Sequence, residues 1–129
     1  LSEKIQLVNA CTGDRVLAEN LQDEQNKYLD VNIQRLHTIK DQVIKFEKSL
    51  EFKNLPQLIK HINDYWDIKK ELSPDITNLM IDGLIDKYRG PQCGVKLCGA
   101  GHSGYLLLLG DIKGNTSVKI DTLGAQIIY

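Results

Sequence analysis

The segment GVKLCGAGHSGYLLLL, residues 94–109, contains two strand patterns on either side of a glycine-rich turn. Val95 and Leu97 alternate with Lys96, which is the period of two that a half-buried strand shows. Residues 105–109 form an unbroken apolar run, which is typical of a strand buried on both faces. We therefore expect two strands joined by a tight turn, with successive leucines of the second strand on opposite faces.

The turn satisfies the pattern GxGxxG through Gly99, Gly101 and Gly104. In dinucleotide-binding folds this pattern opens a helix, whereas here a buried strand follows, so we exclude that fold. Two roles stay open for the glycines. They can let main-chain amides approach an anion, or they can simply supply the positive φ of a hairpin. In either case we expect Gly101 to need a positive φ or a close backbone approach.

The sequence before this segment is helical in its pattern. From Arg15 to Leu50 there is no proline or glycine, and apolar residues recur at steps of three or four. This stripe comprises Ile33, Leu36, Ile39, Val43, Phe46 and Leu50. We expect one long amphipathic helix or two abutting ones, packed on their own domain. A coiled-coil seam is the alternative.

Two more helices follow. Asn54 and Pro56 supply a cap and a first-turn proline for the first of them, which ends at residues 72–74. Asn78 can cap the second, which stops at the Gly-Pro pair of residues 90–91.

Further strand patterns lie at both ends of the chain, at residues 4–11, 118–121 and 125–129. The order is therefore one strand, a block of helices and then several strands. Segregated runs of this kind indicate an α+β fold rather than a doubly wound sheet. A chain of 129 residues is expected to form one domain.

Composition excludes several partners. Lys and Arg number 16 against 17 Asp and Glu, so we expect neither a nucleic acid nor an anionic membrane as partner. No apolar run approaches the length of a membrane span, and no signal-peptide pattern opens the sequence. The three cysteines lack CxxC spacing, so we expect reduced thiols and no metal site. We expect a cytoplasmic protein. The chain begins at Leu1 and runs straight into a strand pattern, so we also expect a fragment of a longer protein.

Residues 94–109 resemble the third signature of the GHMP kinases, G-A-K-(L/M)-(T/S)-G-A-G-G-G-G followed by an apolar strand. His102 and Ser103 depart from it, since many members have glycine there. Residues 65–78, YWDIKKELSPDITN, are similar to the W-x-x-K-x-x-L-S-x-x-I-(S/T)-N segment of heptose-phosphate and L-fucose kinases in that family. Residues 5–15 resemble the opening strand and turn of the same C-terminal domains.

The resemblance implies that residues 1–129 are a ferredoxin-like α+β C-terminal domain, packed against an N-terminal domain with the ligand cleft between them. It implies an ATP-dependent kinase whose substrate is a sugar or sugar phosphate. ATP and Mg²⁺ would be held mainly by the N-terminal domain, whose P-x-x-x-G-(L/I)-G-S-S segment does not occur in this sequence. We therefore expect the chain to be inactive alone, and we assign no catalytic base.

The resemblance also places the glycine loop near the nucleotide phosphates. This loop comprises Gly99, Ala100, Gly101, His102, Ser103 and Gly104. Ser103 and protonated His102 could each donate to a phosphate, but we expect an exposed, tolerated substitution at both positions.

Three other side chains are candidates for the substrate side. Trp66 could stack on a sugar, although its helical stripe favours the core. Lys69 could reach a substrate phosphate, although a solvated lysine is commoner. Lys96 is the better-placed cation, unless strand alternation turns it to solvent.

The alternative is a function without catalysis. The chain could be a standalone ferredoxin-like module that binds a small ligand on its sheet, or that forms a homodimer through the long helix.

Overall fold

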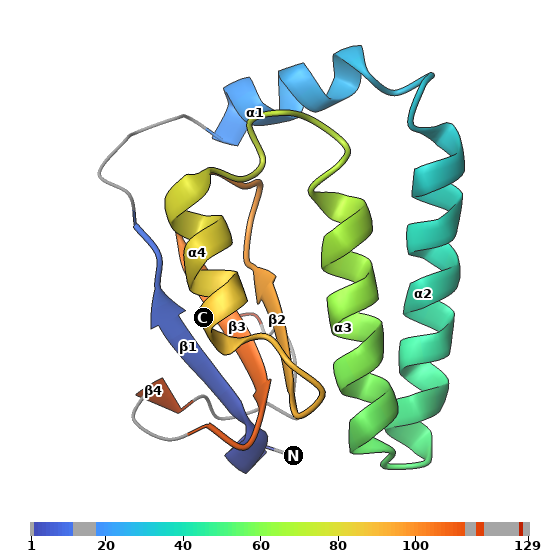
Figure 1. Ribbon diagram of the computed structural model, residues 1–129. Helices are drawn as coiled ribbons and strands as arrows, with labels where there is room; N and C mark the ends of the chain where they lie inside the picture. Colours follow the sequence, from blue (N-terminus) through green and yellow to red (C-terminus); the bar gives the residue numbers. More distant parts are fainter. Residues whose placement is uncertain (1, 12–17, 113–115, 118–126, 128–129) are drawn as a thin grey trace.

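The computed structural model describes residues 2–11, 18–112, 116–117 and 127. Helices lie between the first strand and the later strands, so the α+β prediction is confirmed (Figure 1). The elements are η1 (Ser2–Lys4), β1 (Ile5–Asn9), α1 (Ala18–Lys27), α2 (Ile33–Glu51), α3 (Leu55–Lys69), α4 (Leu79–Tyr88), β2 (Cys93–Leu97), β3 (Tyr105–Gly110) and β4 (Thr116–Ser117). The strand patterns at 118–121 and 125–129 lie outside the described residues, apart from Ile127, which is in no strand.

The four strands form one antiparallel sheet in the order β2-β3-β1-β4. Both β1 and β2 run antiparallel to β3, so they share a direction with β3 between them. This is the split β-α-β arrangement of ferredoxin-like folds, as expected. The helical block α1–α4 makes the crossover from β1 to β2 (Figure 1).

The leucine run of β3 is buried on both faces, which confirms the expectation. Leu106 and Leu108 are 0% and 1% exposed and pack in the main core with residues of α4. Leu109 and half-buried Leu107 belong to a second cluster with residues of α3. Tyr105 differs, being exposed, because it lies at the end of the ladder, opposite the last residue of β1.

Helix α3 begins where the sequence predicts, since the Asn54 side chain accepts a hydrogen bond from the Gln57 amide at 3.2 Å. It lies along the outer edge of β2. A Cβ at Gly94 would be 3.1 Å from the Ile59 carbonyl oxygen, which is tighter than most real Cβ contacts, so a side chain here would require a small shift of α3. The Asn63 side chain extends this contact. Its Nδ2 atom donates to the Cys93 carbonyl at 3.3 Å, and its Oδ1 atom accepts from the Val95 amide at 3.0 Å.

The long helical pattern is divided between α1 and α2, the second of the two alternatives. Helix α2 packs against α3 rather than on the sheet, and none of its residues is buried. The prediction that its apolar stripe packs on its own domain is therefore only partly correct. Leu36, Ile39 and Phe46 are half-buried, whereas Ile33, Val43 and Leu50 are exposed. No helix of the described chain is long and apolar enough to cross a membrane.

Candidate functional site

The glycine loop, residues 99–104, has a backbone that requires its glycines. Gly99, Gly101 and Gly104 have φ values of +87°, +128° and +137°, which side-chain-bearing residues rarely adopt. His102 also has a positive φ, of +67°, and histidine is among the residues that tolerate it best.

One side of the loop rests on the segment before α4. The His102 amide donates to the Ile76 carbonyl at 2.7 Å, and the Asn78 side chain donates to the His102 carbonyl at 2.8 Å. A Cβ at Gly101 would lie 2.7 Å from the Ile76 carbonyl oxygen, closer than real Cβ atoms come. Gly101 therefore needs both a positive φ and a close backbone approach. Asn78 also caps α4, since it accepts from the Ile81 amide at 3.0 Å.

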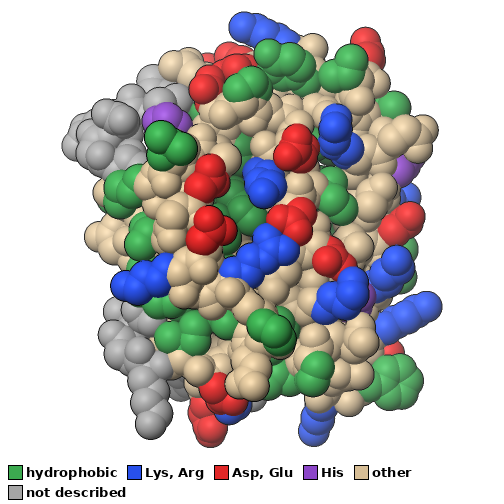
Figure 2. Space-filling view, in the orientation of Figure 1, with side chains coloured by type: hydrophobic (Ala, Val, Ile, Leu, Met, Phe, Trp, Pro, Cys, Tyr) green, Lys and Arg blue, Asp and Glu red, His purple; other side chains and the backbone are tan. Residues whose placement is uncertain are grey.

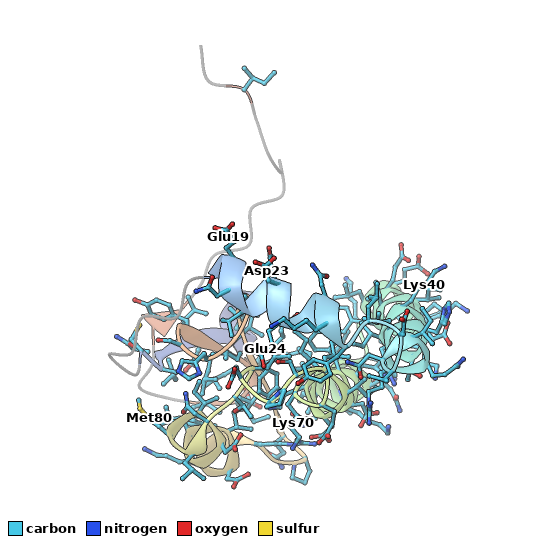
Figure 3. All side chains as sticks on the ribbon, turned by 90° about the horizontal axis from the view of Figure 1, so that it is seen from above. Glu19, Asp23, Glu24, Lys40, Lys70 and Met80 are labelled. Atoms are coloured by element: carbon cyan, nitrogen blue, oxygen red, sulfur yellow. The ribbon has the colours of Figure 1, made fainter. Side chains whose placement is uncertain are left out.

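The other side of the loop is bound to β1 and α1. The Ala10 amide donates to the Gly104 carbonyl at 2.8 Å. The Gln25 side chain, on α1 at one end of the sheet and helices (Figures 1 and 3), donates to the Ala100 carbonyl at 3.1 Å. Contacts from several elements thus fix the loop without any residue from outside the chain.

Three successive amides at the tip stay available. Among the described residues, the N–H groups of Gly99, Ala100 and Gly101 donate to no protein acceptor. Gly99 is exposed, and the other two residues are half-buried. Backbone amides grouped in a turn with positive φ values favour an anion. Three such donors in succession are the feature of the loop that bears on anion binding.

The two departures from the glycine-rich signature are not the exposed substitutions that we expected. His102 and Ser103 are both half-buried, because the chain folds back at this point onto Ile76 and Asn78. The His102 Nδ1 atom is buried and has no hydrogen-bond partner among the described residues.

The three substrate-side candidates separate in the structure. Trp66 is 2% exposed and packs in the main core, so its indole offers no face to a sugar. Lys69 and Lys96 are both half-buried. Lys69 Nζ lies 3.5 Å from Gln25 Oε1, and Lys96 Nζ lies 4.9 Å from the centre of the Tyr65 ring. Lys96 is therefore not simply turned to solvent.

Burial shapes the ionisation of this region. It lowers the pKa of Lys69, and the positive charge of Lys96 lowers that pKa further. Burial also raises the pKa of the Tyr65 hydroxyl, with a smaller contribution from Cys98. The Tyr65 hydroxyl therefore stays protonated and can donate a hydrogen bond at neutral pH.

An apolar groove of about 290 Å³ lies beside Lys96, between α2, α3 and the sheet. Its apolar lining includes Ile5, Val43, Phe46, Ile62, Leu107 and Leu109, with Tyr65, Lys96, Gln42 and His61 supplying the polar atoms. The His61 Nδ1 atom is 3.1 Å from Gln42 Oε1. Burial is the main cause that lowers the pKa of His61, so the imidazole is mostly neutral at pH 7.

The described part of the chain contains no cluster of three or more His, Cys, Asp or Glu that could hold a metal ion. On the face shown in Figure 2, basic and acidic side chains are interspersed, and no large patch of one sign appears.

Sequence reasoning missed two residues that hold the loop. Gln25 lies in a segment with no recognisable motif, and nothing in the sequence pairs it with Ala100. Asn78 was predicted as a helix cap, but its second bond, to His102, depends on the tertiary fold.

Comparison with known proteins bears on the fold. No family model matches the chain, and no curated protein sequence does. The structure of L. major mevalonate kinase in complex with R-mevalonate is similar, with a TM-score of 0.67 and 18% sequence identity. The match covers 84% of this chain but only 34% of that kinase. The fold is therefore similar to that of a part of this kinase. At this identity the likeness shows the fold alone.

Proposed function

We propose that the chain is the C-terminal part of an ATP-dependent small-molecule kinase and that its glycine loop faces the nucleotide phosphates. The observation that carries the proposal is that the amides of Gly99, Ala100 and Gly101 donate to no acceptor among the described residues, on a loop that several elements of the chain hold in place. The likeness of fold to part of a mevalonate kinase supports it, as does the resemblance of residues 94–109 to the GHMP signature.

Phosphoryl transfer depends mostly on positioning and on neutralising phosphate charge. The loop amides would contribute part of this by donating to phosphate oxygens. ATP and its Mg²⁺ would be held mainly by an N-terminal domain of the same parent protein, as the resemblance to the GHMP kinases implies. The chain alone would therefore not turn over. The three free cysteines suit the reducing cytoplasm, where ATP is available.

We propose a sugar or sugar phosphate as the acceptor. The support is the similarity of residues 65–78 to the corresponding segment of heptose-phosphate and L-fucose kinases. Of the two candidate side chains in that segment, Trp66 serves the core, so Lys69 is the one that we propose for the acceptor.

The test is ATP-dependent phosphorylation of a panel of sugars and sugar phosphates by the parent protein. We expect transfer to at least one acceptor by the parent protein and none by residues 1–129. Gly101→Ala should lower kcat/KM strongly in the parent protein. Gly83→Ala should not, because a Cβ at that position in α4 meets no atom within 4 Å. Turnover by residues 1–129 alone, or unchanged kinetics in the Gly101 variant, would contradict the proposal.

The apolar groove favours a second candidate function, binding of a small apolar ligand without catalysis. The groove lies on the sheet face that carries Leu107 and Leu109, where a ligand-sensing module would be expected to bind. Titration with a fluorescent apolar probe should give saturable binding that Val43→Glu abolishes. Only this second candidate predicts that the apolar probe binds equally well with and without nucleotide and that the parent protein transfers no phosphate.

A further inference from the structure

Two lysines stand beside the glycine loop without counter-charges. Lys69 is the last residue of α3, and Lys96 lies in β2. Both are half-buried, and Lys96 Nζ lies 4.9 Å from the ring of Tyr65, which is one helical turn before Lys69 on α3. The positive charge of Lys96 also lowers the pKa of Lys69. Among the residues that the structure describes, neither lysine has a carboxylate within 4.0 Å.

Among the described residues, the other half-buried lysines are Lys4 and Lys70, and each forms an ion pair with an aspartate. Lys60, Lys70 and Arg89, on or near the same helix, each form an ion pair with an aspartate. Two acidic side chains of α1, Glu19 and Asp23, point away from the body of the domain (Figure 3). The third, Glu24, lies toward the domain but interacts with Asp75, and it forms no ion pair with either lysine. Withdrawing two like charges from water without a counter-charge disfavours folding. A ligand of opposite charge would remove that cost.

Gln25 connects the lysines to the loop. Its Oε1 atom lies 3.5 Å from Lys69 Nζ, while its Nε2 atom donates to the Ala100 carbonyl at 3.1 Å. Because the Gln25 side chain makes both contacts, it alone separates Lys69 from the glycine loop. An anion bound by the lysines would therefore lie next to the loop.

We propose that Lys69 and Lys96 bind a phosphate dianion carried by a reactant of the kinase. Two point charges match the two negative charges of a phosphate monoester, and lysine commonly binds phosphate as a point charge. That the phosphate belongs to a reactant rests on the proposed kinase function. That phosphate is carried either by a phosphorylated acceptor or by the nucleotide.

The site is tested by titrating the chain with inorganic phosphate against chloride at equal ionic strength. The readouts are Tm and the ¹³Cε chemical shift of Lys69 followed with pH. We expect phosphate to raise Tm and to raise the pKa of Lys69, since a bound anion favours the charged amine. Lys69→Met and Lys96→Met should each weaken phosphate binding about tenfold or more. Both should retain or increase Tm without phosphate, because each removes one of two repelling charges.

The matched control is Lys60→Met on the same helix, where the lysine already has Asp64 as its partner. It should bind phosphate as the unaltered chain does. Equal phosphate affinity in the Lys69→Met, Lys96→Met and Lys60→Met variants would overturn the site.

Competition identifies the source of the phosphate. A hexose 6-phosphate that displaces inorganic phosphate, where the unphosphorylated hexose does not, assigns the site to the acceptor. Displacement by ATP alone assigns it to the nucleotide. Displacement by neither would mean an adventitious ion only and would overturn the proposal. Because these measurements involve no turnover, their failure leaves the kinase proposal to its own transfer assay. Phosphate binding without transfer by the parent protein would instead count against the kinase.

Discussion

Replacing Gly101 with alanine should destabilise the chain through two separate effects. At a φ of +128° a side chain strains the backbone, which costs about 1–3 kcal/mol. The new Cβ would also be 2.7 Å from the Ile76 carbonyl oxygen and 2.8 Å from the Ile76 Cα. Relieving such an overpacked contact typically costs another 1–3 kcal/mol or so. The sum of about 2–6 kcal/mol is a large part of the roughly 5–15 kcal/mol that stabilises an ordinary domain.

Gly104→Ala is the matched control. Gly104 has a similar φ of +137°, but a Cβ there would have ordinary contact, 3.5 Å from the Cys98 carbonyl oxygen. It should therefore cost only the backbone strain, about 1–3 kcal/mol. Urea unfolding can be followed by the fluorescence of the single tryptophan, Trp66, with the slope of each transition checked for two-state behaviour. Equal losses in the two variants would refute the argument that Ile76 dictates glycine at position 101.

Other parts of the chain give three further predictions. Asn78→Ala should cost more in urea unfolding than Asn54→Ala, because Asn78 caps a helix and also holds the His102 carbonyl, whereas Asn54 only caps. The bidentate hydrogen bonds from Arg89, at 2.6 Å each, are the main cause that lowers the pKa of Asp67. This pairing stabilises the chain above the unfolded-state pKa of about 3.9, and that contribution is lost as the pH falls through the lowered folded-state value. Asp67→Asn should therefore destabilise the chain at pH 7 and flatten the acid limb of its stability curve, and an unchanged acid limb would contradict this. Burial raises the pKa of Cys93 to about 11, so a thiol reagent at pH 8 should label exposed Cys11 quickly and Cys93 only after unfolding.

The sequence predicted those features of the fold that depend on local chemistry. The caps at Asn54 and Asn78 are examples, since an asparagine side chain reaches amides only two or three residues away. The two-faced burial of β3 was also predictable, because five consecutive apolar residues leave no polar face for water.

The exposed stripe of α2 was not predictable, because periodicity shows which face of a helix is apolar but not how much of the chain covers it. The loop was anticipated as a phosphate-facing turn, but its supports come from Ile76, Asn78 and Gln25. These residues lie more than 20 positions before the loop, and only the tertiary fold brings them to it. The proximity of Lys69 to Lys96 has the same origin, because one lies on a helix and the other on the strand beside it.

The contact between Asn63 and the edge of β2 has a consequence for self-association. An uncovered edge strand offers its amides and carbonyls to any extended chain, and intermolecular β-aggregation begins at such edges. Here the Asn63 side chain donates to the Cys93 carbonyl and accepts from the Val95 amide. Helix α3 therefore covers this edge of β2. A folding intermediate in which the sheet had formed before α3 docked would expose this edge to other chains. The lifetime of that intermediate, rather than the stability of the native state, should determine the yield of refolding at high protein concentration.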